Sequence, residues 1–374
     1  MRILQLVSCR GWSSDAYWAA RTTRELERRG HTVRLVCLAG KESRVLDGMR
    51  REGVEPVTTL TFASGVHPGK DVRDVVRLRG LLDGADVVHV HRGKEHWLAA
   101  VANRLITRPR PLVRTRHIAL AVRPHAANRW LYRRATALVV TVTEAIRGQF
   151  VASGLVDADR VVALHGGADA ERYRPLPRDP EMHRHLGARP GQPLVGMVAG
   201  LRVMKGHAIV VEAAARLAAR GIRPHFAFVG RGNVEKMVRG TIERAGLATQ
   251  FSIVGFVDDL PAVLAALDVA LYVPLESDGM SRVVFESLAA GRPLVASRVG
   301  VVPEVLADGR HAALVPAGDA EALAAALGTL VSDSAQRERL GESGRRLIDE
   351  RYSGARVAAA LESRYAPLVT AGAA

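Results

Sequence analysis

Cysteine is scarce in this chain, which has two among its 374 residues. Cys9 and Cys37 both lie inside apolar, strand-like runs, so we interpret them as buried free thiols rather than as a disulfide. Two isolated cysteines also cannot supply the ligand set of a structural zinc site. The sequence therefore excludes metal binding by cysteine and predicts two thiols within the core.

Long hydrophobic runs are lacking as well. No stretch of about 18 apolar residues could span a bilayer. Arg10 interrupts the short apolar segment at the start, which does not have the pattern of a signal peptide. With 48% hydrophobic residues, the chain can nevertheless bury sizeable cores. We therefore expect a globular, cytoplasmic protein of two domains.

Acidic residues are absent from one long stretch, because none occurs between Glu95 and Glu144. Residues 1–175 hold 30 Lys and Arg against 17 Asp and Glu, which is most of the formal net charge of +15. A field of this sign attracts an anionic partner such as nucleic acid, a phosphorylated glycan or the inner membrane face, at which the protein would be peripheral. The alternative is an arginine-biased composition with solvated side chains. Nine arginines occupy the acid-free stretch: Arg104, Arg108, Arg110, Arg114, Arg116, Arg123, Arg129, Arg133 and Arg134.

Short apolar runs alternate with amphipathic stretches along the chain, which is the pattern of parallel sheets with helices on both faces. Two such series are separated by the proline-rich stretch Arg174–Pro180, which has the composition of a linker. The sequence predicts an α/β fold with two doubly wound Rossmann-like domains, residues 1–175 and 176–350. An amphipathic helix in residues 351–374 is expected to pack back across the domain junction.

Two segments of the second half have the character of anion sites. One contains Asp278 and Glu286, eight positions apart, around a Gly-Met-Ser turn that opens an alanine-rich helix. Unpaired N–H groups at such a helix start favour phosphate. In the other, a buried strand ends in a loop that carries Arg202 and Lys205, a pair that suits a diphosphate beyond the end of a parallel strand. Together they predict a nucleoside diphosphate pocket.

These motifs resemble the retaining glycosyltransferases of family 4, whose GT-B fold consists of two facing Rossmann-like domains. The resemblance covers nearly the whole chain and is strongest from Val195 to Pro316. Each part is weak alone, but six parts in the family's order are a specific signal. They are the Arg202–Lys205 loop, Val229-Gly230-Arg231-Gly232, Val254-Gly255-Phe256-Val257, the acidic pair, Ala290-Gly291-Arg292-Pro293 and Val302-Pro303-Glu304.

The resemblance implies roles for individual residues. Arg202 and Lys205 would hold the donor diphosphate, and Glu286 would bind the nucleotide ribose. Fixed cations and helix N-termini would stabilise the leaving diphosphate, so neither a cofactor nor a metal is expected. Glu304 is either a binding residue or part of a helix start. The remaining contacts would come from Gly279, Met280, Ser281 and Arg282 at the phosphate and sugar, and from Gly230, Gly232, Phe256 and Val257 along the base; Arg282 on the helix surface is the alternative.

Two parts depart from the family's commoner pattern. The first acid of the pair is Asp278 where glutamate is common, and Glu276 is the other candidate for contact with the donor sugar. In the loop after the first strand, where relatives often have two glycines, Gly11 and Ser13 are the expected substrate-side residues. Ser13 or Ser14 is expected to cap the following helix.

His117 ends a predicted strand and matches the position of the family's active-site histidine, which touches the donor sugar. His89 and His91 also end a strand, and at least one of them is expected to be structural. An aromatic group in the first half is interpreted as core rather than as an acceptor platform: Trp12, Tyr17 and Trp18.

The sequence thus predicts an enzyme that transfers a sugar, with retention of configuration, from a nucleotide diphosphate-sugar to a glycan or lipid-linked acceptor in cell-envelope polysaccharide or lipopolysaccharide synthesis. The second domain would bind the donor, the basic first domain would bind an anionic or lipid-linked acceptor, and the cleft would close between them. The alternative is a nucleic-acid- or anionic-surface-binding protein on the same scaffold without turnover. Nucleic acid is not the expected partner, because no reading helix or stacking motif is visible.

Overall fold

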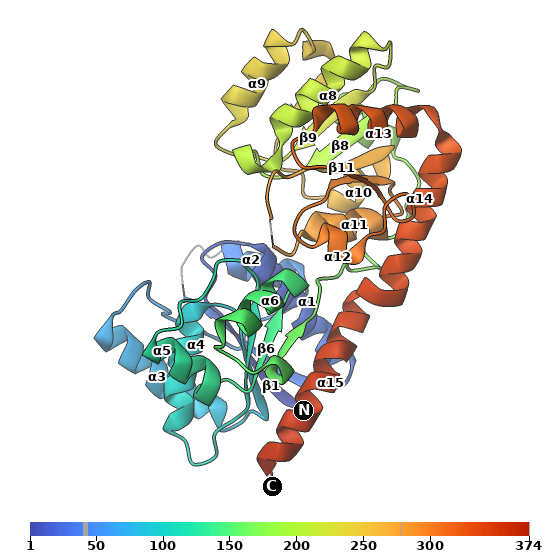
Figure 1. The fold of residues 1–374 in the computed structure, drawn as a ribbon. Helices are drawn as coiled ribbons and strands as arrows, with labels where there is room; N and C mark the ends of the chain where they lie inside the picture. The colour runs from blue at the N-terminus through green and yellow to red at the C-terminus, as the bar shows by residue number, and fades with distance from the viewer. Residues whose placement is uncertain (40–43, 278, 374) are drawn as a thin grey trace. The chain divides into compact units, whose positions relative to one another are not determined.

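The computed structural model describes residues 1–39, 44–277 and 279–373. The chain forms two compact units, which we call the first unit (Met1–Gly166 with Gly354–Ala374) and the second unit (Gly167–Ser353) (Figure 1). Among the described residues, no helix combines the length and the apolar character that crossing a bilayer requires.

The first unit is built on a parallel sheet of seven strands in the order β3-β2-β1-β4-β5-β6-β7. Its central strands are buried on both faces, which explains why their sequences are mostly apolar. The strand order reverses between β1 and β4, so the connections after these two strands leave on opposite faces. The strands are β1 (Arg2–Val7), β2 (Thr32–Leu38), β3 (Thr58–Leu60), β4 (Val87–Val90), β5 (Leu112–Arg116), β6 (Leu138–Thr141) and β7 (Val161–Ala163).

Helices cover both faces of this sheet (Figure 1). The last helix of the chain packs against the first, where Arg29 and Glu362 form an ion pair with a closest N···O distance of 2.5 Å. The C-terminal helix is therefore part of the first unit. The helices are α1 (Ser14–Arg28), α2 (Arg44–Arg51), α3 (Pro68–Leu82), α4 (Gly93–Arg104), α5 (Ala126–Trp130), the π-helix η1 (Leu131–Ala135), α6 (Glu144–Ser153), the 3-10 turn η2 (Ala158–Arg160) and α15 (Gly354–Ala373).

The second unit repeats this architecture with six parallel strands in the order β10-β9-β8-β11-β12-β13. One hydrophobic cluster lies on each face of the sheet, the first around Phe285 and the second around Phe226 and Phe228. Here the strand order reverses between β8 and β11. The strands are β8 (Leu194–Val198), β9 (His225–Val229), β10 (Phe251–Val254), β11 (Val269–Tyr272), β12 (Leu294–Ser297) and β13 (Ala313–Val315).

The helices of the second unit follow the strands in alternation. They are α7 (Pro180–His185), the 3-10 turn η3 (Val203–Lys205), α8 (His207–Ala219), α9 (Glu235–Arg244), the 3-10 turn η4 (Ala248–Gln250), α10 (Leu260–Ala266), α11 (Arg282–Ala289), α12 (Val302–Val305), α13 (Ala320–Ser332), α14 (Ser334–Leu347) and the π-helix η5 (Ile348–Tyr352).

The unit boundaries differ from the divisions at 175/176 and 350/351 that we expected from the sequence. Tyr173 is buried in a core cluster of the second unit, and Arg345 donates to the carbonyl oxygens of Ala170 and Tyr173 over 3.0 and 3.1 Å. The chain is thus already part of the second unit before the proline-rich stretch. At the other end, the second unit retains η5 and Ser353.

Both cysteines lie in the core of the first unit as free thiols, which confirms the sequence prediction. Burial raises the pKa of Cys9 and of Cys37 to about 12. Neither sulfur is therefore a thiolate nucleophile at neutral pH.

Candidate functional site

The strand order places two predicted anion-binding loops side by side in the second unit. β8 and β11 are hydrogen-bonded neighbours, with Gly196 opposite Ala270. The loop with Arg202 follows β8, and the Gly-Met-Ser turn follows β11, so both leave the same edge of the sheet. The backbone N–H of Leu275 donates to the carbonyl of Met204 over 2.8 Å and ties the loops together. Ligands of open parallel sheets bind at this kind of reversal point.

The cationic loop after β8 depends on one glycine. Arg202 is exposed at the start of η3, and Lys205 is half-buried at its end. Gly206 follows with a φ of +81°, and a Cβ atom there would lie 2.1 Å from the carbonyl oxygen of Val273. Only glycine has both the required conformation and the space. The loop therefore passes directly against the end of β11, which brings the two cations to that strand.

The glycines after β9 have a packing role that the structure shows directly. A Cβ atom on Gly230 would lie 2.1 Å from the Ala199 carbonyl oxygen, and one on Gly232 would lie 2.0 Å from the Leu201 carbonyl oxygen. The Leu201 N–H also donates to the carbonyl of Arg231 over 3.2 Å. The loops after β8 and β9 thus pack backbone against backbone. Contact of these glycines with a nucleotide base stays a prediction.

Phe256 and Val257, which follow β10, face different surroundings. Phe256 is 63% exposed, whereas Val257 is half-buried against the core cluster of this unit. An exposed aromatic ring at this edge is available to a planar ligand. Val257 has a role in packing, and its contact with the base stays a prediction.

The turn before α11 is buried and unusually shaped. Gly279, Met280 and Ser281 are all buried, and Ser281 has a φ of +52°, which is uncommon outside glycine. The Ser281 hydroxyl forms a buried hydrogen bond with the Tyr272 hydroxyl instead of capping α11. The Ser281 side chain therefore does not cap the first N–H groups of α11, which suits an anion-binding helix start.

Glu286 and Arg282 form an ion pair inside α11. The Glu286 carboxylate is buried, and Arg282 Nε lies 2.8 Å from its Oε1 atom, one helical turn away. The Arg282 side chain, 28% exposed, thus follows its own helix. The first acid of the predicted pair, Asp278, lies outside the described residues, and Glu276, the other candidate for its role, is exposed. Glu304 is half-buried in the first turn of α12, beside Pro303.

In the first unit, His117 lies in a buried group of imidazoles at the carboxyl ends of β4 and β5. His117 is 7% exposed, and its Nε2 atom is 3.2 Å from His91 Nδ1. His91 Nε2 is 2.9 Å from Gln5 Oε1. Trp18 packs edge-on against this group, with ring centroids 5.7 Å apart for His117. Sequence reasoning did not include Gln5; a polar residue in a buried strand was the available signal.

His89 is held by different partners from His91. Its Nε2 atom is 2.6 Å from the Thr115 hydroxyl, and its Nδ1 atom is 2.6 Å from the hydroxyl of Tyr365 on α15. Both ring nitrogens are thus paired inside the protein. His89 is structural, as expected of at least one histidine of this strand.

The loop after β1 joins this group through Asp15. Ser13 has the N-cap position of α1, but its hydroxyl hydrogen-bonds to the Asp15 carboxylate rather than to the helix backbone. Arg92 Nε donates to Asp15 over 2.6 Å. Although burial opposes ionisation, the hydrogen bond from Arg92 and the proximity of His117 lower the pKa of Asp15. Gly11 is half-buried, and a Cβ atom on it would have no neighbour within 4 Å.

The aromatic residues of α1 belong to the core, as expected. Tyr17 and Trp18 are 2% and 3% exposed. The ring of Trp12 lies against α2, where a Cβ atom on Gly48 would be 2.1 Å from it. These rings therefore do not form an exposed platform.

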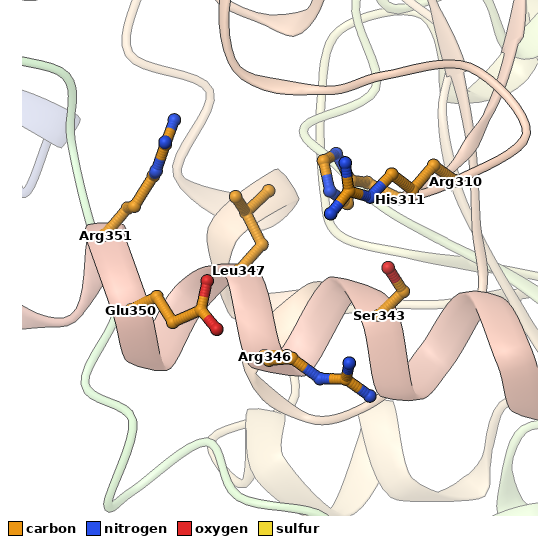
Figure 2. A pocket seen from close by; sticks show the side chains of 7 residues that line it. All are labelled: Arg310, His311, Ser343, Arg346, Leu347, Glu350 and Arg351. Carbon is orange, nitrogen blue, oxygen red and sulfur yellow. The ribbon is translucent and has the colours of Figure 1, made fainter.

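One cavity of about 310 Å³ in the second unit contains none of the predicted site residues (Figure 2). Ser343 and Leu347 on α14 point toward the loop with Arg310 and His311, whereas Arg346 extends away from that loop (Figure 2). Because this loop precedes β13, the cavity lies at the opposite edge from the cationic loop. Within the described ranges, no cluster of three or more His, Cys, Asp or Glu side chains could hold a metal ion.

Two family models match this chain. Residues 16–172 match the model described as Glycosyltransferase Family 4, and residues 178–347 match Glycosyl transferases group 1. The chain belongs to the family 4 glycosyltransferases. The matches meet between residues 172 and 178, near the boundary of the two units.

Relatives with assigned activities share part or most of the sequence. The 2-deoxystreptamine N-acetyl-D-glucosaminyltransferase of Streptomyces fradiae is 31% identical over 279 residues, which are 68% of this chain but only 64% of that protein. The chain thus spans less than two thirds of that relative's length. The lipopolysaccharide core biosynthesis mannosyltransferase of Rhizobium leguminosarum is 27% identical over 76% of this chain and 78% of that protein.

The fold is similar to that of a solved structure. HepE of Anabaena, determined in complex with UDP and glucose, superimposes with a TM-score of 0.80 over 98% of this chain and 99% of its own, at 19% sequence identity. This likeness confirms the predicted GT-B fold of two Rossmann-like units.

Proposed function

We propose that the protein is a retaining glycosyltransferase that moves a sugar from a nucleoside diphosphate donor to an acceptor hydroxyl group. The bond between the anomeric carbon and the diphosphate breaks, and the acceptor oxygen forms the new bond on the face that the diphosphate leaves. The acceptor proton passes to the departing nucleoside diphosphate. The observation that carries this proposal is the pairing of the Arg202–Lys205 loop with the Gly279–Ser281 turn at the ends of β8 and β11.

The chemistry of a departing diphosphate suits this edge. Negative charge builds up on the leaving group in the transition state, and fixed positive groups stabilise it most where they are already in place. Arg202 and Lys205 supply side-chain cations, and the start of α11 supplies N–H groups and the positive end of a helix dipole. In the proposed reaction these groups stabilise the negative charge of the leaving diphosphate without a divalent ion.

Glu286 is the proposed contact for the nucleotide ribose. Its carboxylate can accept hydrogen bonds from two neighbouring hydroxyl groups, and Arg282 holds it in one orientation. The exposed ring of Phe256 is the proposed neighbour of the base. HepE of Anabaena binds UDP, which supports a nucleotide-sugar donor here.

The proposed acceptor is an anionic or lipid-linked glycan of the cell envelope, such as a lipopolysaccharide core, reached from the inner face of the membrane. The first unit supports this through its basic surface, because six of the nine arginines in its acid-free stretch are exposed. The lipopolysaccharide activity of the Rhizobium relative supports the same class. The six are Arg104, Arg108, Arg123, Arg129, Arg133 and Arg134.

A turnover assay tests this function. The protein is incubated with UDP-, GDP- and ADP-linked hexoses and with truncated lipopolysaccharide, in the presence of a chelator, and released nucleoside diphosphate is measured. We expect turnover with one donor, a product of unchanged anomeric configuration by NMR, and loss of turnover in Arg202→Ala. Arg220→Ala, at the far end of α8, is the matched control and should retain activity.

Two results would contradict the proposal. Turnover that stops in the chelator would overturn the metal-free part. Absence of turnover with every donor, together with salt-dependent binding to nucleic acid or anionic vesicles, would favour a binding protein on the same scaffold.

A further inference from the structure

The orientation of the Gln5 amide is fixed by a hydroxyl group on α1. Thr22 Oγ1 lies 2.9 Å from the carbonyl oxygen of Trp18, and a carbonyl can only accept, so the Thr22 hydroxyl donates there. Its lone pairs are then free to accept from Gln5 Nε2, at 3.4 Å. Thr23 Oγ1 accepts a hydrogen bond from the same amide nitrogen over 3.0 Å. The Gln5 nitrogen therefore faces α1, and its oxygen faces His91.

This orientation determines which nitrogen of each imidazole carries the proton. Because Gln5 Oε1 only accepts, His91 must donate to it from Nε2, over 2.9 Å. In a neutral imidazole the other nitrogen is then an acceptor, so His91 Nδ1 receives the hydrogen bond from His117 Nε2 over 3.2 Å. His117 therefore carries its proton on Nε2 and a lone pair on Nδ1.

Both rings are neutral at physiological pH. Burial lowers the pKa of His117 to about 3, with Arg114 acting in the same direction and Asp15 opposing it. Burial, assisted by the neighbouring histidines and Arg114, holds the pKa of His91 well below its usual value. A doubly protonated ring, which would break the chain of acceptors, is thus disfavoured.

His117 Nδ1 is the one ring nitrogen of this group that no hydrogen bond from the described residues reaches, although it is buried. His89 and His91 have partners on both nitrogens. A buried acceptor without a donor costs free energy that a ligand hydroxyl could recover. The lone pair on His117 Nδ1 therefore lies at the end of the series of hydrogen bonds that runs from Thr22 through Gln5 and His91.

We propose that Gln5 and His91 are positioning residues that fix His117 in its Nε2–H tautomer, so that Nδ1 accepts a hydrogen bond from a hydroxyl group of the sugar substrate. Contact with a sugar rests on the proposed function, whereas the tautomer does not. His117 Nδ1 would therefore select a sugar position that carries a hydroxyl group, which can donate a hydrogen bond. A group that can only accept would face the Nδ1 lone pair and be disfavoured.

Long-range proton–nitrogen NMR spectra of the full chain, with ¹⁵N-labelled histidine, read the tautomer directly. We expect the wild-type protein to show His117 as the Nε2–H form, assigned by its loss in His117→Gln. Gln5→Met removes the acceptor with little change in volume and should give His117 as a mixture of tautomers. If that variant does not fold, Thr22→Val tests the same chain at its start.

Tyr365→Phe is the matched control. It removes a buried hydroxyl from the same group of rings, but from His89, which lies outside the chain of bonds. The His117 tautomer should be unchanged in this variant. Loss of the Nε2–H form in Tyr365→Phe as well would show a general packing effect and overturn the proposal.

Kinetics then separate this inference from the proposed function. We expect Gln5→Met to lower kcat about tenfold while affinity for the nucleoside diphosphate stays unchanged. An Nδ1–H form of His117 in the wild-type spectrum would overturn the inference even if transferase activity is found. An Nε2–H form without any transferase activity would leave the tautomer assignment standing and refute the sugar contact.

Discussion

The carboxyl edges of the two sheets carry different kinds of polar groups. In the second unit, the cations Arg202 and Lys205 and the helix N–H groups are placed by backbone packing, and glycines such as Gly206 allow the loops to touch. In the first unit, neutral imidazoles around His117 are placed by side-chain hydrogen bonds among buried residues. The first arrangement suits binding of a charged group such as a diphosphate. The second suits recognition of one particular hydroxyl group.

Backbone contact makes the second unit's edge intolerant of a single methyl group, and this is the largest effect we predict. Gly206→Ala should lower stability by at least about 3 kcal/mol and abolish donor binding, because its Cβ would meet Val273. Gly221→Ala is the control: its φ of +79° matches, but the space is open, so about 1 kcal/mol is expected. Calorimetric unfolding measures both, and equal losses would refute the role of close packing.

The buried ion pair of α11 is the next test. Arg282→Met leaves the Glu286 carboxylate without its arginine in the core and should cost about 3 kcal/mol. Arg239→Met removes an arginine from a pair with Glu235 at the same helical spacing, but on the surface, and should cost less than about 1 kcal/mol. Similar Tm values for both variants would show that Arg282 is not needed to hold Glu286.

Neutral histidines make the first unit sensitive to acid. The pKa of His117 is lowered to about 3 from an ordinary value of 6.5, so the unfolded chain takes up a proton below pH 6.5 that the native state refuses. Stability therefore falls as pH drops between 6.5 and about 3. From pH 7 to pH 5 the loss from this ring is about 2 kcal/mol.

The comparison variant for this effect is His117→Gln. Unfolding monitored by calorimetry at pH 7 and pH 5 should show a smaller decline in the variant than in the wild-type protein. An identical decline would mean that His117 is protonated in the folded state well above pH 5.

The smallest predicted effect concerns the helix that returns to the first unit. Tyr365→Phe should cost about 1 kcal/mol, because the Nδ1 atom of buried His89 loses its partner. Donor affinity should be unchanged, since the loops proposed to bind the donor lie in the second unit. A change in affinity would link α15 to the donor loops and weaken the division between the two edges.

The alternation of apolar and amphipathic runs in the sequence predicted two parallel sheets with helices, and the structure confirms both sheets. The edge strands β3, β7 and β13 could not be located from the sequence, because each has three residues, too few for a periodic pattern. The same reason applies to short helices such as α12. Helix α14 has 14 residues but is rich in charged and small side chains, so its sequence shows no clear apolar face.

For the candidate site, glycine and charge patterns were visible, but hydrogen-bond partners were not. Gln5 lies 86 residues from His91, and Tyr365 lies 276 residues from His89. Only the folded sheet and the returning helix bring these pairs together. The pairing of Arg282 with Glu286 needs one helical turn and could have been inferred from their spacing.

In the proposed function, the cationic loop after β8 holds the donor diphosphate. The most direct test is calorimetric titration of the wild-type protein with UDP, GDP and ADP, followed by titration of Arg202→Ala, Lys205→Ala and the control Arg220→Ala with the preferred nucleotide. We predict selective binding without added metal, weakened about tenfold or more in the first two variants and unchanged in the third. Equal affinity in all four proteins would contradict the claim.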